Sequence, residues 1–518
     1  MKKIGLGLVF ITIISLIFIF TEKENAFSFL TGTPLLCAKN EPLCKDICSI
    51  NRSLSFDLYK KKSPTEKRTE LVKSCKTLEE LAQTRFKKNK SKDAKINILI
   101  IGNNGGGGHK SAGDAITKIL KELPGQTDLF NTVYLEPFAS SLTNGWNKAL
   151  QQEDGKTLAW LCGNKRLFDF GLGLFPFNSM LRSTIKDAME KPDVIVQVQP
   201  LGTARFKRIA KDMRAQHRVV PTDLRVDQFV DGIKNIPANN LRFSIDIMGD
   251  MPDLTEVLEK KSIKSYVPVG YPTRLEILDL TEKIHSSDTK IKNKAEQEVQ
   301  DFLTKQTGFG IVNNKLEENI KFNKDDAVIF IMIGAKGTLA SRIIRYTRII
   351  AQHATMLAPK NKKVHLFLAQ ADSFVDALKE ELKTVALATK NPPIVVHALG
   401  KVSAQEVGML MHSGVTLTKA GGSTVAELLT LKAPAVFDMS VSQYIVWEKY
   451  AADLFVKNKW GIQLTNPEND KEVANALKKA FELRNNCCAS MPNNQFHLDW
   501  PKALIDDLSL FLCDQLAR

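Results

Sequence analysis

The sequence predicts an α/β protein of two domains, each built on a mostly parallel sheet with crossover helices. Short apolar runs of strand length alternate with stretches of helical period in two separate regions. The first run, 96–101, ends in a glycine-rich loop that leads into a helical pattern. With 518 residues, of which 43% are hydrophobic, the chain has enough apolar material for two domains and extensions.

The N-terminal segment, residues 1–22, is expected to be a membrane anchor or a signal segment. Lys2 and Lys3 precede an apolar run from Ile4 to Phe20. This run lies near the lower end of the roughly 17 to 25 residues that cross hydrocarbon as a helix. No crisp small-x-small cleavage motif follows closely, which favours an uncleaved anchor over a signal peptide.

Residues 23–93 are expected to form a linker rich in lysine and cysteine, exposed from Tyr59 to Lys95. The formal net charge of +15 points to an anionic partner. The chain shows neither a helix-turn-helix nor an RNA-binding signature, so we expect an anionic membrane surface and no nucleic acid. Lysines near such a surface would contribute about 1 kcal/mol each.

Four of the eight cysteines, Cys37, Cys44, Cys48 and Cys75, crowd behind the apolar run. They are compatible with two disulfides in an oxidising compartment or with a zinc-like cluster. Their spacings match no standard pair of zinc ligands closely. Unpaired thiols are the third interpretation.

The first domain is expected to span residues 94–274. The strand 96–101 precedes a helix marked by Ala112, Ala115, Ile116 and Ile119, and further strands are expected at 193–198 and 217–220. Residues 275–324, rich in Lys and Glu, are expected to be a helical insertion. The second domain, 325–484, carries strand-like runs at 328–333, 364–369, 394–396, 415–417 and 435–437, and the segment 485–518 ends in a helix from 500 to 516.

Two glycine loops carry the chemistry. After the first strand, His109 stands between the glycines and Lys110, so the loop does not encode a nucleotide-triphosphate P-loop. Instead, a histidine at the helix start follows small residues that let a substrate approach its ring. After the run 415–417, the glycines in Thr418-Lys-Ala-Gly-Gly-Ser-Thr-Val-Ala-Glu427 begin a helix, whose free amides and dipole suit a diphosphate. Glu427 is alternatively the end of a capping box that starts at Thr424.

These motifs resemble those of the monogalactosyldiacylglycerol synthase family, relatives of the peptidoglycan N-acetylglucosaminyl transferase among the GT-B glycosyltransferases. The resemblance covers about Ile96 to Arg484 and implies two Rossmann-like domains that face a central cleft. Any one motif would be weak evidence, but five in order are strong. They are Gly105-Gly-Gly-Gly-His109, Thr222-Asp223-Leu224, Gly270-Tyr-Pro-Thr-Arg274, Gly334-Ala-Lys-Gly337 and Lys419-Ala-Gly-Gly-Ser-Thr-Val-Ala-Glu427.

The resemblance also implies roles for individual residues. His109 would face the acceptor, and Glu427 would accept hydrogen bonds from the ribose of a UDP-sugar. Asp223 matches a family position near the cleft, and a turn or helix cap is its alternative role. Gln443 stands where the family holds sugar hydroxyls, but Tyr444, Ile445 and Val446 replace the acidic and Asn residues that usually follow. The implied donor-side residues are Gly334, Lys336, Gly337, Lys419, Gly421, Gly422, Ser423, Thr424, Glu427 and Gln443, and the implied acceptor-side loop is Gly105, Gly106, Gly107 and Gly108.

The expected function is the transfer of a hexose from UDP-galactose or UDP-glucose to a lipid, diacylglycerol above all, with inversion at the anomeric carbon. His109 is the expected general base and Asp223 the first alternative. The UDP-sugar is a substrate, and the scheme needs no cofactor and no metal. His217, His365, His397 and His412 lack metal-ligand spacing and are expected to be structural.

Three other functions stay open at this level. One is a UDP-N-acetylglucosamine transferase that acts on an isoprenoid-linked saccharide, and the others are a nucleotide-sugar epimerase of the same fold and a non-catalytic relative. The protein is expected at a membrane through its N-terminal segment, with the cytoplasmic face favoured because UDP-sugars are cytosolic in bacteria.

Overall fold

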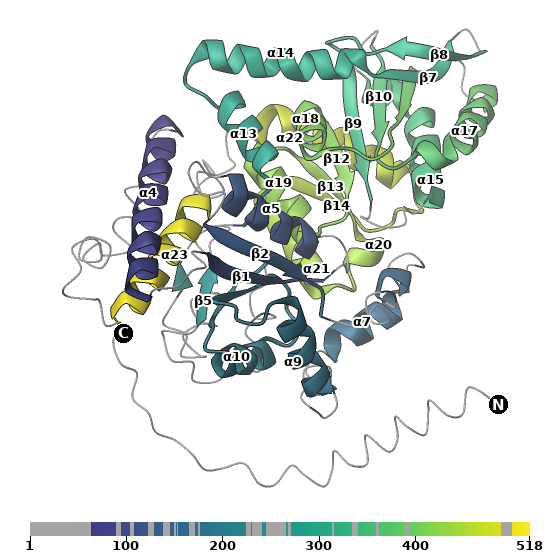
Figure 1. Ribbon diagram of the computed structural model, residues 1–518. Coiled ribbons are helices and arrows are strands. Elements are labelled where there is room, and N and C mark those ends of the chain that lie inside the picture. Colours follow the sequence, from purple (N-terminus) through teal and green to yellow (C-terminus); the bar gives the residue numbers. More distant parts are fainter. Residues whose placement is uncertain are drawn as a thin grey trace, which may run out of the picture. The chain divides into compact units, whose positions relative to one another are not determined.

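The computed structural model shows two α/β domains (Figure 1). The structure describes residues 64–89, 95–103, 108–122, 129–137, 144, 146–149, 152, 154–164, 171–172, 174, 177–223, 229, 241–244, 266–267, 271–312, 315–333, 340–358, 362–388, 393–487 and 500–517. The apolar run Ile4–Phe20 and the loops 104–107 and 334–339 lie outside these residues.

The N-terminal domain is built on a six-stranded parallel sheet in the order β2-β1-β3-β4-β5-β6. Alternate residues of β1 enter different hydrophobic clusters, with Ile98 and Ile100 on one face and Leu99 and Ile101 on the other. Both faces are therefore covered, which explains why the strand reads as an unbroken apolar run. The strands are β1 (Ile96–Ile101), β2 (Phe130–Leu135), β3 (Val194–Gln197), β4 (Gln216–Val219), β5 (Leu241–Ser244) and β6 (Tyr266–Val267), and the helices are α5 (Gly108–Glu122), α7 (Gly155–Gly163), α9 (Phe177–Ala188) and α10 (Thr203–Asp212).

The C-terminal domain is built on an eight-stranded sheet in the order β14-β13-β12-β9-β10-β11-β7-β8. Its core strands are parallel, and all of them except the last, β14, lie where the sequence predicts them. They are β9 (Ala327–Met332), β10 (Val364–Leu368), β11 (Ile394–Ala398), β12 (Val415–Thr418), β13 (Ala435–Asp438) and β14 (Gly461–Leu464). The helices of this domain are α15 (Ala340–Gln352), α16 (Ala354–Leu357), α17 (Val375–Ala388), α18 (Ala404–Ser413), α19 (Gly422–Leu431), α20 (Met439–Ser442), α21 (Val446–Lys457) and α22 (Asp470–Cys487), with a 3₁₀ turn, η1 (Asp372–Phe374).

The expectation of a purely helical insertion at 275–324 is wrong for its second half. The helices α13 (Leu275–Ile284) and α14 (Thr289–Lys305) are followed by the antiparallel strands β7 (Thr307–Val312) and β8 (Lys315–Lys321). Through β7, this hairpin joins β11 and extends the C-terminal sheet. Because β8 is an edge strand with mostly exposed residues, its Lys- and Glu-rich sequence gives no apolar signal.

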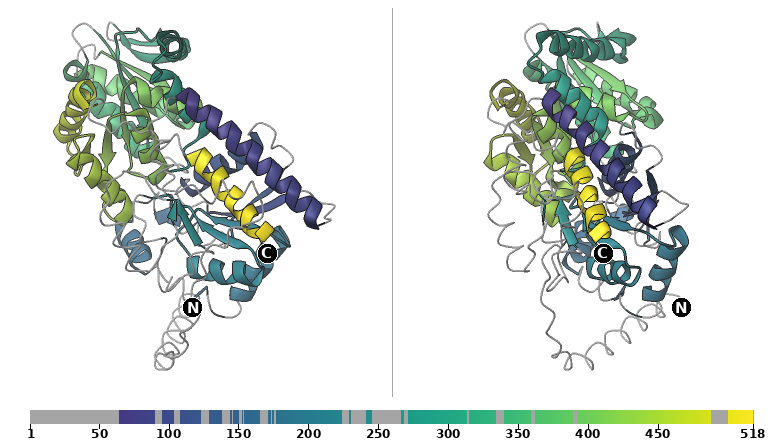
Figure 2. Two further views of the ribbon diagram at one scale, coloured as in Figure 1. Left: turned by 90° about the vertical axis from the view of Figure 1, so that its left-hand side faces the viewer. Right: turned by 60° about the vertical axis from the view of Figure 1, so that its left-hand side comes forward.

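The expectation of an exposed connector is also wrong, because residues 64–89 form a packed helix. Helix α4 (Pro64–Asn89) buries Cys75, Leu78 and Leu81 and lies beside the C-terminal helix α23 (Trp500–Ala517), as both views of Figure 2 show. Its exposed face carries the lysines that suggested a solvated linker, among them Lys73 and Lys76. The helix is therefore amphipathic, and its apolar face is covered by tertiary packing.

Helix α23 belongs to the N-terminal domain in space although it ends the chain. Its Asp507 accepts a hydrogen bond from the Nε of Arg218 on β4, and both side chains are buried. Arg85 of α4 also reaches this domain, where it pairs with Asp193 at the start of β3. Two buried or half-buried ion pairs thus fasten the terminal helices to the first sheet.

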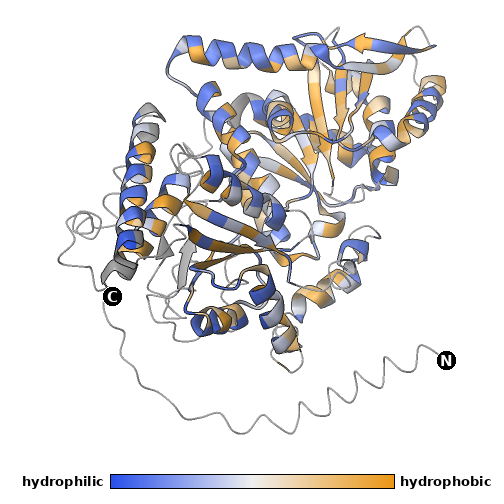
Figure 3. Ribbon diagram, viewed as in Figure 1, coloured by the Kyte–Doolittle hydropathy of each residue, from blue (hydrophilic) through white to orange (hydrophobic). Residues whose placement is uncertain are grey.

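Apolar residues gather in the strands of both sheets, whereas α14 is hydrophilic along most of its length (Figure 3). Within the described residues, no helix is both long and apolar enough to cross a membrane. The predicted anchor, Ile4–Phe20, falls outside those residues, so it stays a prediction.

Three cysteines have defined states. Cys75 and Cys162 are not disulfide-bonded, and burial raises the pKa of the Cys75 thiol to about 11, which makes it unreactive. Cys75 therefore takes no part in the two disulfides considered above, while Cys37, Cys44 and Cys48 lie outside the described residues. Cys513 on α23 is disulfide-bonded.

Candidate active site at the seam between the domains

The carboxyl ends of strands from both sheets meet along one line of contact, which we call the seam. On the N-terminal side, β1 leads to the start of α5, and β4 leads to Thr222 and Asp223. On the C-terminal side, β12 leads to the start of α19. A Cβ placed on Gly422 would lie 2.0 Å from the carbonyl oxygen of Thr222, so only glycine permits this approach. The glycine turn before α19 and the chain after β4 are therefore in direct contact, at the place where the sequence predicts the site.

His109 lies in the first turn of α5, and its ring has a fixed orientation. Its Nδ1 is 2.6 Å from the Oγ1 of Thr222, and that hydroxyl donates its own hydrogen to the carbonyl of Val198 at 3.0 Å. Because the threonine has no second hydrogen to give, Nδ1 of His109 must be the donor. The neutral ring therefore carries its proton on Nδ1 and leaves the lone pair of Nε2 to accept another.

The charge state of His109 is set by its surroundings. Burial lowers the pKa of His109 to about 4, and the positive Lys419 adds to this effect, while the Val198 carbonyl opposes it. The ring is thus neutral at pH 7. A neutral imidazole with one free nitrogen is a proton acceptor.

A buried acid pair lies at the same seam. Asp223 is only 7% exposed, and burial, together with the nearby Glu448, raises its pKa well above the ordinary value, with Lys419 opposing. Lys419 donates to Glu448 at 2.6 Å, and Ser442 donates to the other oxygen of Glu448 at 2.7 Å. The two carboxyl groups therefore have different environments, since Glu448 has two donors and Asp223 is pushed toward its protonated form.

Helix α19 begins with an open N-terminus at the seam. Its N-cap is Gly421, which offers no side chain to the first amides. The helix start at Gly422 places Ser423 and Thr424 in the first turn, and Ser423 lies against Gly108 of the other domain. Free amides at a helix N-terminus attract anions. The capping box considered for Thr424 and Glu427 is wrong, because the helix has already begun before Thr424.

Glu427 lies inside α19 and forms an ion pair that the sequence did not indicate. Its two oxygens accept hydrogen bonds from Nε and Nη2 of Arg274, at 2.6 and 2.8 Å. The carboxylate is almost fully buried, and Arg274 is about a quarter exposed. This bidentate pair joins the N-cap of α13 to the middle of α19, so Arg274 competes with any ribose for Glu427.

Other predicted residues lie at the edge of the seam or outside the described part. Gln443 is exposed and donates to the carbonyl of Ser440 at 3.3 Å. Trp447 stacks on Trp146 of the N-terminal domain with centroids 6.0 Å apart, while Trp460 is buried in the core. The structure does not describe Gly105, Gly106, Gly107, Gly334, Lys336 and Gly337, so their implied roles stay predictions.

Glu448 is the seam residue that sequence reasoning missed. It lies in the first turn of α21, five residues after Gln443 and directly behind the segment that departs from the family pattern. The available signal was an acidic residue at a helix start shortly after the carboxyl end of a buried strand, β13. That signal is weak, because acidic residues in the first turn of a helix commonly interact favourably with the helix dipole and need no other role.

The remaining histidines fit their structural interpretation with one exception. His365 and His397 bond each other at 2.8 Å in the C-terminal core, and His217 faces Gln197 at 3.0 Å. Among the described residues, no group of three His, Cys, Asp or Glu is placed to hold a metal. His412 differs, since its side chain is 20% exposed, contacts Glu296 and lines a pocket away from the seam.

No protein-family model and no curated protein matches the chain. Solved structures with similarity include the calicheamicin glycosyltransferase CalG4, at 11% identity, 81% coverage of this chain, 98% of that chain and a TM-score of 0.41. MurG of Acinetobacter baumannii is 12% identical, the match covers 80% of this chain and 99% of that chain, and the TM-score is 0.41. MnaA of S. aureus with UDP is 11% identical, the match covers 79% of this chain and 94% of that chain, and the TM-score is 0.42. At these values the similarities carry no argument about function.

Two α/β domains, each built on a mostly parallel sheet, are present as the sequence predicts, and the carboxyl ends of their strands meet at the seam.

Proposed function

We propose that the protein is a glycosyltransferase that moves a hexose from a UDP-sugar to a lipid hydroxyl, diacylglycerol above all. The observation that carries this proposal is His109, whose Nδ1 is held by Thr222 so that Nε2 is free, opposite the open N-terminus of α19. A proton acceptor on one domain and an anion-binding helix start on the other are the two parts that such a transfer needs.

The proposed step is one displacement. Nε2 of His109 takes the proton of the acceptor hydroxyl while its oxygen forms a bond to the anomeric carbon. The bond from that carbon to the diphosphate oxygen breaks, and UDP leaves with the electron pair. The amides of Gly422, Ser423 and Thr424 and the ammonium of Lys419 would stabilise the charge on the diphosphate. A single attack on an α-linked donor gives a β-linked product, which is the inversion expected above.

The lipid acceptor is supported by two features of the chain. The N-terminal run Ile4–Phe20 has the composition of a membrane segment. Three large apolar side chains on the consecutive described helices α7 and α9 are strongly exposed, with Trp160 at 49%, Phe177 at 56% and Met180 at 60%. Exposed aromatic and apolar groups of this kind suit a membrane interface.

The test of the function is transfer itself. Purified full-length protein is incubated with radiolabelled UDP-galactose, UDP-glucose or UDP-N-acetylglucosamine and with diacylglycerol or an isoprenoid-linked saccharide. Label that moves into the organic phase with diacylglycerol supports the proposal. Label only on the isoprenoid acceptor, an epimerised nucleotide sugar, or no turnover would each establish one of the alternatives left open by the sequence.

Glu427→Gln should weaken UDP binding by about ten- to a hundredfold, since a charge-assisted hydrogen bond to the ribose contributes roughly 1.5 to 3 kcal/mol. The same substitution removes half of the bidentate pair with Arg274, so it should also lower the melting temperature. Calorimetric titration with UDP and thermal unfolding measure the two effects.

Arg274→Gln is the matched control, because it breaks the same ion pair from the other side and keeps the carboxylate of Glu427. It should lower the melting temperature while UDP affinity stays within a few-fold of wild type. Equal losses of UDP affinity in the two variants would show that Glu427 acts only through its ion pair.

Deleting residues 1–22 should move the protein from the membrane to the soluble fraction. Residual binding to vesicles should prefer anionic lipid and weaken with salt, since exposed charges are screened within about 8 Å at physiological ionic strength. Cosedimentation with neutral and anionic vesicles over a range of salt concentration measures this. Residual binding that ignores salt would count against the role of the basic residues.

The side of the membrane is a separate part of the proposal. Cytosolic UDP-sugars favour the cytoplasmic face, whereas the disulfide at Cys513 is typical of an oxidising compartment. Alkylation of acid-quenched, denatured protein with and without prior reduction reports whether Cys513 is oxidised in cells, which distinguishes the two locations.

A further inference from the structure

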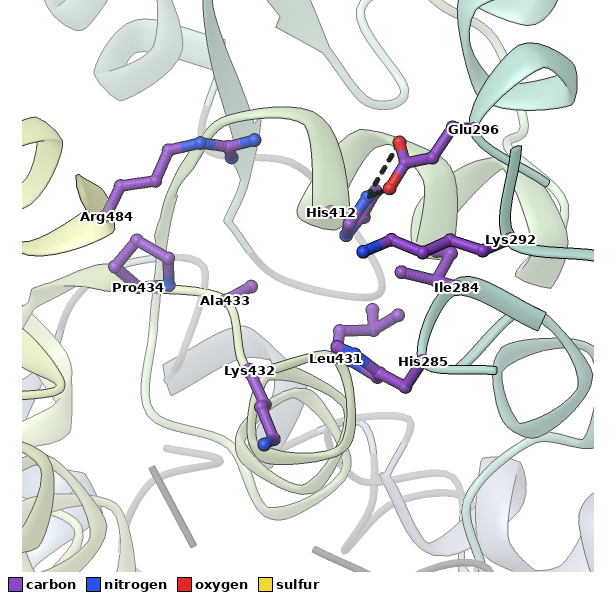
Figure 4. A pocket seen from close by; sticks show the side chains of 10 residues that line it. All are labelled: Ile284, His285, Lys292, Glu296, His412, Leu431, Lys432, Ala433, Pro434 and Arg484. Carbon is purple, nitrogen blue, oxygen red and sulfur yellow. Dashed lines mark hydrogen bonds and ion pairs between the residues drawn. The ribbon is translucent and has the colours of Figure 1, made fainter. Parts of the chain in front are cut away.

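A second site for an anion lies in a pocket of about 290 Å³ in the C-terminal domain (Figure 4). The pocket is formed where α13, α18 and α19 end, together with α14 and α22. In Figure 4, Lys292 and Arg484 reach toward its middle from opposite sides, and the dashed line joins His412 to Glu296. The remaining lining residues include His285, Lys432 and Pro434.

The pocket is electropositive. Lys292, Lys432 and Arg484 are permanent cations, against the single carboxylate of Glu296. The positive charge also acts on the pKa of His285. Burial lowers this pKa to about 4, and the charges of Lys432, His412 and Lys292 lower it further, while Glu296 opposes them. Glu296 itself has a lowered pKa, first because it bonds His412 and then because Lys292 and Arg484 are near.

Helix electrostatics explain some of these cations but not all. Lys432 and His285 are the C-caps of α19 and α13, where positive charge is favourable. Arg484 donates to the carbonyl of Gly414 at 2.8 Å, just beyond the end of α18. Lys292, in contrast, lies in the fourth position of α14, near an N-terminus with no acidic residue in its first turn. A lysine there gains no stabilisation from the dipole of its own helix, and this one lines the pocket.

A neighbouring hollow of about 480 Å³ shares Glu296, His412 and Arg484 with this pocket. Its wall is polar, with Gln300, Asp325 and Ser413 among its lining residues. Oxygen and amide groups of this kind bind hydroxyls, whereas the cations bind a phosphate. The two spaces together therefore suit a ligand with a phosphate at one end and hydroxyls at the other.

We propose that this pocket binds a soluble phosphomonoester of a small polyol, such as a hexose monophosphate, with its phosphate between Lys292 and Arg484. The site is separate from the seam. Helix α19 starts at the seam with Gly422 and ends at the pocket with Leu431, so the two sites are separated by about 15 Å of helix.

The test is calorimetric titration of the full chain with a hexose monophosphate and with inorganic phosphate, in saturating UDP. We expect one saturable site for each probe, with the hexose monophosphate binding more tightly. Lys292→Gln combined with Lys432→Gln should weaken both by at least about tenfold. The matched control is Lys290→Gln with Lys294→Gln, which removes the same charge from exposed positions of α14 outside the pocket and should leave affinity unchanged.

A second readout is the titration of His285, followed by NMR with labelled histidine. A bound phosphate should raise its pKa, because a negative charge would then face a ring now surrounded by Lys432, His412 and Lys292. Equal loss of affinity in the pocket and control variants, or displacement of the probes by UDP, would overturn the proposal. If the protein binds only vesicles that carry a phosphomonoester lipid, and the pocket variant loses this binding, the ligand is a lipid headgroup and the proposal of a soluble ligand is wrong.

Discussion

His109→Ala should reduce turnover by about 10² to 10⁴, the usual contribution of a positioned general base, while UDP affinity stays nearly intact. The hydrogen bond from Nδ1 to Thr222 aligns the ring, and Nε2 is the atom whose loss removes the proton acceptor. His109→Gln separates alignment from proton transfer, because its amide can donate to Thr222 but cannot take a proton at neutral pH. Both variants should therefore be slow.

The pH profile of the wild type gives an independent check. With a pKa of about 4, His109 is neutral and able to act above that pH, so kcat/KM should fall only as the pH approaches 4 from above. The bound donor adds negative charge near the ring, which favours the protonated form and should place the acid limb of kcat at higher pH. A single limb at the same pH for both parameters would contradict a base beside the diphosphate.

The control for His109 is His353→Ala, which removes a histidine from the N-cap of α16, far along the chain from the seam. It should leave turnover unchanged. If His109→Ala also keeps near-normal turnover with its proper acceptor, the base is another group. Asp223 is then the first to test as Asp223→Asn, since burial and Glu448 raise its pKa toward a range where it can exchange a proton.

Asp507→Ala should lower the free energy of unfolding by about 3 to 5 kcal/mol, the cost of leaving a buried charge without its partner. Arg218 is 5% exposed, and it would keep its hydrogen bonds to Gln216 and to the backbone of His217 but lose the carboxylate that balances its charge. Because Arg218 lies on β4, the strand that leads to Thr222 and Asp223, the loss should also loosen the acceptor side of the seam. Urea unfolding followed by circular dichroism measures the change.

Two comparisons define this effect. Asp212→Ala breaks the ion pair between Asp212 and Arg182, whose side chains are both 53% exposed, and should cost only about 0 to 1 kcal/mol. The double variant Arg218→Met with Asp507→Leu replaces the buried pair by apolar side chains and should recover much of the lost stability. A loss in Asp507→Ala no larger than in Asp212→Ala would show that α23 is held by its apolar contacts alone.

The sequence predicted β1, β3 and β4 of the first sheet and β9 to β13 of the second, because strands covered on both faces need apolar residues at every position. It also placed His109 and Gly422 at helix starts, since glycine-rich turns between a buried strand and a helix follow from local chemistry. Local chemistry did not reveal β8 or the packing of α4. Strand β8 is a polar edge strand, and in α4 the buried apolar residues alternate along the sequence with exposed lysines.

Only the tertiary structure decided what the charged residues do. In sequence, Glu427 was compatible with a helix cap, and Glu448 carried no distinctive signal. Their partners are Arg274, 153 positions away, and Lys419, 29 positions away. A local pattern encodes the conformation of its own segment, whereas an ion pair or an acid beside a base depends on which segments the packed core brings together. For this reason the sequence predicted the two domains and named His109, Asp223 and Glu427 as candidates, while Glu448 and the ion-pair partners of the carboxylates had to be found in the fold.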